Sequence, residues 1–98
     1  MLLKLDGLIT AVTAPSDDPA YDCVSRVFAP KLAIDEDPVT GSTHCMITPY
    51  WCKRLGKNSL TCYQASERSG ILYTSLRGDR VCVAGKAVLY SSGDILRQ

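Results

Sequence analysis

Two strands are predicted by the first hydrophobic pattern along the chain. Residues 8–14 are rich in β-branched side chains, and the turn-forming segment from Pro15 to Pro19 closes them. From Tyr21 to Phe28 the side chains fall into two alternating sets, as expected for a second strand that ends before Pro30. One set is Tyr21, Cys23, Ser25 and Val27, and the other is Asp22, Val24, Arg26 and Phe28. The beginning of the chain is therefore predicted to be strand, loop and strand.

A helical period follows in the middle of the chain. We expect one helix over about residues 41–56, with Thr40 as its N-cap and Gly56 as a stop in the left-handed conformation. Pro49 lies inside it and is expected to kink it, because a proline there deletes one hydrogen bond at a cost of about 3 kcal/mol. Apolar residues three and four positions apart define one face: Met46, Ile47, Tyr50, Trp51 and Leu55.

Strand patterns return after the helix. Gly78-Asp79 is a favourable hairpin turn between two of these runs. One helix among several strands predicts the α+β class, and residues 1–98 are expected to form a single domain, without an internal repeat or a linker. The predicted strands separated by glycine-containing turns are 60–65, 71–77, 80–84 and 87–91.

Composition and charge exclude some partners. With 46% hydrophobic residues the chain has the composition of a folded domain. Eleven Lys and Arg residues oppose ten Asp and Glu residues, and no basic stripe is present, so no nucleic-acid partner is expected. The uninterrupted apolar run from Gly7 to Ala14 is too short to span a bilayer, so no membrane partner is expected either.

The five cysteines form an odd set without a C-x-x-C pair, and the chain has one histidine. This combination argues against a metal site, and we expect no metal and no cofactor. Reduced thiols fit a cytoplasmic protein. Four cysteines lie within helical or strand-like stretches and are expected to pack as small apolar residues: Cys45, Cys52, Cys62 and Cys82.

Candidate chemistry lies in the segment from Asp37 to Ser42, directly before the helix. A helix start binds anions, because its first N–H groups are unpaired and its dipole favours negative charge. We expect a substrate carboxylate to bind here, with Gly41 permitting close approach and the hydroxyls of Thr40 and Ser42 adding hydrogen bonds.

Asp37 lies beside this anion site. A neighbouring substrate carboxylate would favour its protonated form, so Asp37 is the candidate general acid. The alternative is that Asp37 and Thr40 simply cap the helix. His44, one turn into the helix, is a secondary candidate for proton transfer, although a lone histidine on a helix is more often structural. For Cys45 we favour a core position over a role as nucleophile.

A polar block, Gln64 to Gly70, connects two predicted strands. The simplest interpretation is a surface loop, unless Gln64 or Ser66 faces the helix start. Several such motifs follow one another at the intervals of a known family, namely Ser25 to Pro30, Glu36 to Cys45, Pro49-Tyr50-Trp51, Leu55-Gly56-Lys57, Gln64 to Gly70 and Gly78 to Val81.

This series resembles the PhzF-like isomerases of phenazine biosynthesis. It is most similar to the carboxyl-terminal half of the animal phenazine-biosynthesis-like-domain proteins, and the resemblance covers nearly the whole chain. It implies one half of a diaminopimelate-epimerase-like fold, in which antiparallel strands wrap around a central helix. The active site of that fold lies between two similar halves, whose helix starts hold a carboxylated substrate.

The resemblance also assigns roles. A glutamate of the amino-terminal half moves a proton in the family, and the aspartate that matches Asp37 lies opposite it. The related epimerases use two cysteines, and Asp37 stands where they place their second thiol motif. Ser69 replaces the second glycine of the family's Arg-Gly-Gly loop, where the backbone approaches closely. Neither Glu36 nor Glu67 matches the family's glutamate.

Two functional hypotheses follow. The first is a half-domain that binds a small carboxylated molecule and takes part in proton transfer only with a complementary half. The second is a non-catalytic binding or protein-interaction module that keeps the fold. In either case the exposed surface between halves predicts a partner, which is a complementary amino-terminal half or a second copy in a homodimer.

Overall fold

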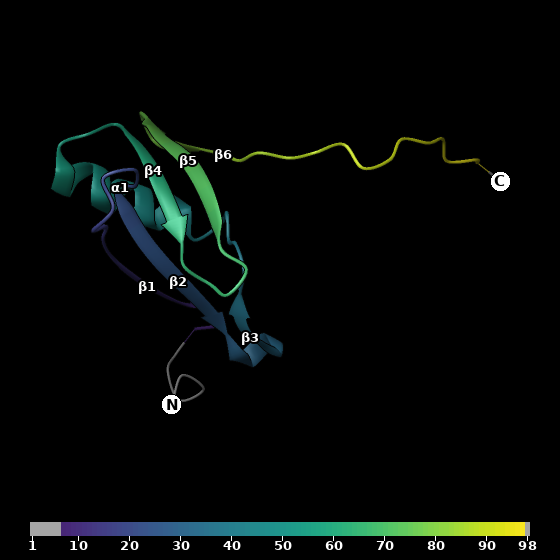
Figure 1. Cartoon of the computed structure of the whole chain (residues 1–98), viewed down its shortest axis with the longest axis horizontal. Coiled ribbons are helices and arrows are strands. Elements are labelled where there is room, and N and C mark those ends of the chain that lie inside the picture. Colours follow the sequence, from purple (N-terminus) through teal and green to yellow (C-terminus); the bar gives the residue numbers. More distant parts are fainter. Residues whose placement is uncertain (1–6, 98) are drawn as a thin grey trace.

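The structure is a computed structural model that describes residues 7–97. It confirms the α+β class: one α-helix and six strands are present in the described residues (Figure 1). A short 3-10 helix at Pro30–Leu32 follows the second strand. The other elements, in chain order, are β1 (Thr10–Pro15), β2 (Cys23–Ala29), β3 (Ile34–Asp37), α1 (His44–Leu55), β4 (Ser59–Gln64), β5 (Gly70–Arg77) and β6 (Arg80–Ala84).

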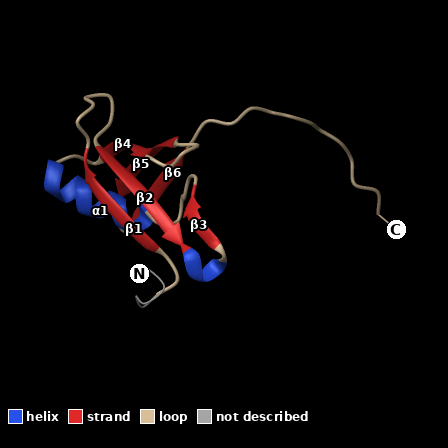
Figure 2. Cartoon of the chain, turned by 60° about the horizontal axis from the view of Figure 1, so that its bottom comes forward, coloured by secondary structure: helices blue, strands red, loops and turns tan. Residues whose placement is uncertain are grey.

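The strands form one sheet in the order β1-β2-β4-β5-β6, and β3 pairs with the end of β2. Four pairings are antiparallel, as the resemblance implied, whereas β2 and β4 are parallel. Parallel neighbours need a crossover connection, and here α1 lies within it. The crossover packs α1 against one face of the sheet, where it contacts β4, β5 and β6 (Figure 2).

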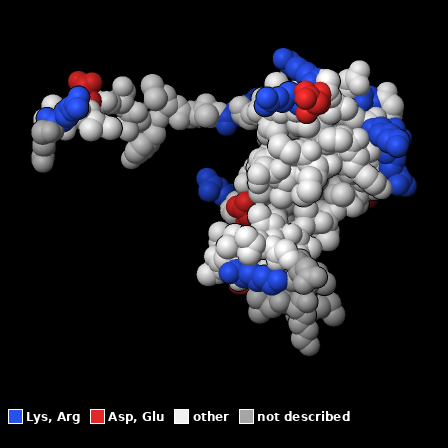
Figure 3. All heavy atoms as spheres, turned by 180° about the vertical axis from the view of Figure 1, so that it is seen from behind, with Lys and Arg blue, Asp and Glu red and all other residues white. Residues whose placement is uncertain are grey.

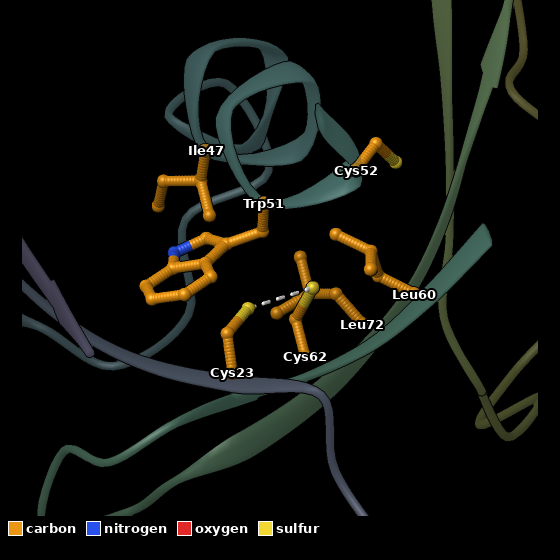
Figure 4. Close-up of a cluster of buried hydrophobic side chains, with 7 residues drawn as sticks. All are labelled: Cys23, Ile47, Trp51, Cys52, Leu60, Cys62 and Leu72. Atoms are coloured by element: carbon orange, nitrogen blue, oxygen red, sulfur yellow. Dashed lines mark hydrogen bonds between the residues drawn. The ribbon is translucent and has the colours of Figure 1, made fainter. Parts of the chain in front are cut away.

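The core fills the space between α1 and the sheet (Figure 4). Trp51 is its largest side chain, and its indole N–H donates to Thr13 Oγ1 at 2.8 Å, which ties the helix to β1. Each buried side chain of this size contributes about 1.5–3 kcal/mol by removing apolar surface from water. The buried cluster comprises Cys23, Ile47, Trp51, Cys52, Leu60, Cys62 and Leu72.

The predicted helix boundaries are partly right. Gly56 ends α1 with φ 67° and ψ 36°, as expected. The start differs, because the helix begins at His44, after a turn, and its N-cap position is Thr43 rather than Thr40. Thr40 is unavailable for capping because its hydroxyl is bonded to the Asp37 carboxylate. The helix continues through Pro49, and the kink expected there stays a prediction.

One predicted strand was wrong, and one strand was missed. Residues 87–91, which include Val88, Leu89 and Tyr90, form no strand, because they pair with no strand of the described residues. The strand β3, in the acidic segment before Pro38, was not predicted. It pairs with β2, and Arg26 on β2 donates two hydrogen bonds to the Glu36 carboxylate, at 2.9 and 2.8 Å.

All five cysteines are free. Cys52 and Cys62 are buried as expected, but Cys45 and Cys82 are exposed, so the expectation of core packing was wrong for these two. Cys23 and Cys62 lie opposite one another on β2 and β4, and the Cys23 thiol donates to Cys62 Sγ at 3.6 Å (Figure 4). This hydrogen bond, together with burial, raises the pKa of the Cys23 thiol.

Candidate functional site

The loop between β3 and α1 is held by the last residue of β4, Gln64, whose side chain is fully buried. The Gln64 amide oxygen accepts from the Thr40 backbone N–H at 2.7 Å. The amide nitrogen donates to the Asp37 carbonyl at 3.0 Å and to Thr40 Oγ1 at 3.1 Å. These two backbone partners, one donor and one acceptor, fix the orientation of the amide. Gln64 therefore joins the end of β3 to the middle of the loop.

The hydrogen bonds from Gln64 continue to the Asp37 carboxylate. Because the Gln64 amide nitrogen can only donate, Thr40 Oγ1 accepts from it, and the Thr40 hydroxyl hydrogen is directed to Asp37 Oδ2. The chain of donors thus has one direction, from Gln64 through Thr40 to Asp37. A proton carried by Asp37 would therefore sit on the other oxygen, Oδ1.

The start of α1 exposes Gly41 and Ser42, whereas Thr40 is buried. The carbonyls of Gly41 and Ser42 accept from the N–H groups of His44 and Cys45, at 3.0 and 3.1 Å. Their own N–H groups have no acceptor among residues 7–97. The Thr40 N–H donates to Gln64 and its hydroxyl to Asp37, and its predicted contact with a ligand stays a prediction.

His44 lies behind the loop and is fully buried. Its Nδ1 is 2.7 Å from the Thr40 carbonyl, which only accepts, so Nδ1 carries the hydrogen. Burial lowers the pKa of His44, and the hydrogen bond to Thr40 opposes this in part. Its Nε2 is buried and has no partner among the described residues. The ring therefore supports Thr40 from inside, whereas the candidate anion site at Gly41 and Ser42 is exposed.

The polar block after β4 faces the helix start rather than forming an ordinary surface loop. Ser66 Oγ donates to the Pro38 carbonyl and accepts from the Ser69 N–H, both at 2.8 Å. A Cβ atom at Gly70 would lie 2.2 Å from a methyl carbon of Val39, so only glycine permits this approach of the two loops. Ser69 adopts φ 62°, a conformation that glycine adopts without strain.

A hollow of about 780 Å³ lies beside Gly41. The rings of Tyr21 and Tyr63 stack there, with centroids 4.9 Å apart. The Lys86 amine lies 6.0 Å from the ring centroid of Tyr73, on the same lining. These aromatic residues were not predicted from the sequence to line a site. The available signal was that Tyr63 and Tyr73 lie at outward-facing positions of two neighbouring strands.

Metal ligands do not gather in the described part of the chain. No three His, Cys, Asp or Glu side chains within residues 7–97 form a group that could hold an ion. None of the helices in those residues has both the length and the apolar character needed to cross a membrane. The face in Figure 3 has a largely uncharged centre, with Lys and Arg side chains near its edges.

Known proteins match this chain over nearly its whole length. The profile of the phenazine biosynthesis-like protein family, PhzC-PhzF, matches residues 3–93. A Pseudomonas aeruginosa protein described as an uncharacterized isomerase is 58% identical over 74 residues, which cover 76% of this chain and 28% of that protein. Mouse phenazine biosynthesis-like domain-containing protein 2 is 45% identical over 95 residues, 94% of this chain and 33% of that protein.

A solved structure agrees. The crystal structure of a PhzF family protein from Enterococcus faecalis superposes with a TM-score of 0.82 at 46% identity, over 90% of this chain and 34% of that chain. The chain thus spans about a third of the length of its relatives, rather than the half that the resemblance implied. Both the sequence matches and the superposition show that the chain belongs to the phenazine biosynthesis-like PhzC-PhzF family.

Proposed function

We propose that this chain is part of an isomerase that binds a small carboxylated molecule at the start of α1 and uses Asp37 to transfer a proton. The observation that carries this proposal is the placement of an oriented carboxylate beside two unengaged backbone N–H groups. Similarity to a Pseudomonas aeruginosa protein described as an isomerase supports the reaction class.

The carboxylate would bind to the N–H groups of Gly41 and Ser42 and to the Ser42 hydroxyl. The helix dipole adds attraction for an anion at this end. The remainder of the ligand would lie in the adjoining hollow, against the stacked rings of Tyr21 and Tyr63. Lys86 lines the same hollow and would attract a second negative group.

Asp37 would exchange the proton through Oδ1, because Thr40 occupies Oδ2. Isomerisation by proton transfer removes a proton from one atom of the substrate and delivers one to another. A second proton carrier would therefore complete the site, and in the proposal a complementary half provides it. The five free cysteines support a reducing compartment, which we propose to be the cytoplasm.

Proton exchange in D2O tests the catalytic part of this proposal. We expect the chain, supplied with a complementary half from a family member, to incorporate deuterium into a carboxylated substrate, as followed by proton NMR. Asp37→Asn should lower the rate by about a hundredfold or more, because general acid–base catalysis contributes on that order. Asp35→Asn is the matched control on the same strand, and its exposed side chain predicts an unchanged rate.

A titration with acetate separates binding from chemistry. We expect the NMR signals of the Gly41 and Ser42 amides to shift, and those of the Thr40 amide to shift less because Gln64 engages it. Amide shifts without deuterium incorporation would favour the non-catalytic binding module. Equal exchange rates in the wild type and Asp37→Asn would contradict the proposed role of Asp37.

A further inference from the structure

The sheet consists of two antiparallel units that meet at one parallel seam, the pairing of β2 with β4. The first unit contains β1, β2 and β3, and the second contains β4, β5 and β6. The seam has three residue pairs, whereas the pairings β1–β2 and β4–β5 have six each. Parallel pairing is also slightly less stable per residue than antiparallel pairing. The two units are thus joined by a short and comparatively weak ladder.

Cys23 and Cys62 form the first residue pair of this seam. Their side chains both point into the core beneath α1, and the two Sγ atoms are 3.6 Å apart (Figure 4). Paired residues on neighbouring strands lie about 4.8 Å apart, which is inside the range of about 4.4–6.8 Å between the Cα atoms of a disulfide. A bond of about 2.05 Å therefore requires movement of the two sulfur atoms but not of the strands.

The two thiols differ in acidity. Cys62 Sγ accepts from the Cys23 thiol and lies 3.8 Å from Thr74 Oγ1. The hydrogen bond from Cys23 lowers the pKa of Cys62, and that from Thr74 adds to this, although burial opposes both. The same bond to Cys62, together with burial, raises the pKa of Cys23. Cys62 is therefore the thiol that ionises first.

We propose that Cys23 and Cys62 are a modification site, at which hydrogen peroxide forms a reversible disulfide across the seam. The Cys62 thiolate attacks one peroxide oxygen, the O–O bond breaks, and the hydroxide that leaves takes up the proton released by Cys62. Cys23 sulfur then attacks the sulfenic sulfur of Cys62. The S–S bond forms, the S–O bond breaks, and the departing hydroxide takes up the Cys23 proton. Two thiols and one peroxide thus give one disulfide and two water molecules.

The position of the pair explains how peroxide reaches two buried side chains. Cys23 is the first residue of β2, so the pair lies at one end of a three-residue ladder. Strand ends open locally at a lower free energy than the middle of a sheet. In a reducing compartment such a disulfide is transient and senses oxidants, because cellular thiols reduce it again.

The bond would enclose the candidate site within one covalent loop. Residues 24–61, between the two cysteines, include β3, the loop with Asp37 and all of α1. The seam ends at the pair Ser25 and Gln64, so Gln64 lies two residues from Cys62 on the same strand. A cross-link that closes a loop of this length stabilises the fold by restricting the unfolded chain. The inference stands independently of the role proposed for Asp37.

Thiol counting tests the disulfide in the full chain carrying Cys45→Ser and Cys82→Ser, which removes the two exposed thiols. The folded protein is treated with hydrogen peroxide, unfolded, alkylated and weighed by mass spectrometry. We expect one alkyl group, on Cys52, against three in untreated protein, because three of the five free cysteines remain. Peptide mapping should link Cys23 to Cys62, and dithiothreitol should restore three alkylated thiols.

Two controls separate geometry from general reactivity. Cys52→Ser removes the third buried thiol of the cluster and should leave the disulfide unchanged. Peroxide treatment in urea should give mixed pairs that include Cys52, because the unfolded chain does not select a partner. Three alkylated thiols after treatment of the folded protein, or a disulfide of Cys52 in the folded protein, would overturn the proposal.

Thermal melts then test the effect on the seam. The oxidised protein should melt about 10 °C or more above the reduced protein, and dithiothreitol should reverse the shift. Cys23→Ser leaves Cys62 without its partner, so peroxide should produce no such rise in that variant. An equal or lower melting temperature of the oxidised protein would contradict a disulfide that fits the native seam.

Discussion

The loop between β3 and α1 and the segment 85–97, here called the tail, differ in how their polar and apolar groups are paired. At the loop, the buried Gln64 amide makes three hydrogen bonds to Asp37 and Thr40, and Ser66 holds the neighbouring Pro38. In the tail, large apolar side chains are exposed, and no strand of the described residues pairs with 87–97.

The difference shows which parts of this chain are ordered by their own contacts. The loop is fixed between β3 and α1 by Gln64 and Ser66, which lie 24 to 28 residues further along the chain. The tail has the pattern of a strand without a neighbour. Its large apolar side chains are exposed, so contacts within the described residues do not fix it.

A pair of identical substitutions tests this contrast most strongly. Leu72→Ala should lower the free energy of unfolding by about 3 kcal/mol, because it leaves a cavity in the buried core. Leu89→Ala in the tail should change the stability of the monomer by less than about 0.5 kcal/mol, since the side chain is 83% exposed. Urea titrations of both variants at low protein concentration give the comparison. Equal losses would contradict it.

The loop network itself is tested by Gln64→Leu. This change removes three hydrogen bonds and leaves the Thr40 N–H and the Asp37 carbonyl without a partner, so we expect a loss of about 2–3 kcal/mol. Thr40→Val in the same background should cost less than it does alone, because the two residues share a bond. Additive losses in this double-mutant cycle would show that the residues act independently.

The pH dependence of stability is expected to come in part from His44. Burial lowers its pKa below 6.5, so the folded state binds its proton less readily than the unfolded state. Stability is then fully present above pH 6.5 and declines as the pH falls toward the lowered pKa, by at most about 1.4 kcal/mol per pH unit. His44→Asn should flatten this part of the stability curve. An unchanged slope would mean that the pKa of His44 is the same in the folded and unfolded states, which would contradict the lowered pKa.

The smallest effect is expected at Ser69. Its φ of 62° is strained for a residue with a Cβ atom, so Ser69→Gly should stabilise the protein by up to about 1 kcal/mol. Ser66→Gly, by contrast, removes the hydroxyl that joins Pro38 and Ser69 and should destabilise it. Thermal melts of the two variants should therefore shift in opposite directions.

The local sequence determined several elements of this fold. Alternation predicted β2, β4, β5 and β6, and the apolar spacing around Trp51 predicted α1. Gly56 and the turn at Gly78 were predicted because glycine is favoured at positive φ. These features depend on neighbouring residues in the chain, so the sequence is sufficient to indicate them.

Tertiary structure decided the rest. The strand β3 pairs with β2, and Arg26 bonds across the pair to Glu36, 10 residues further along the chain; residues 87–91 pair with no strand of the described residues. The sequence identified Asp37, Gly41 and Ser42 as candidates, but it could not show that Thr40 faces inward or that Gln64 orients the carboxylate. Such contacts join positions 24 or more residues apart, and their geometry depends on how the sheet packs against the helix.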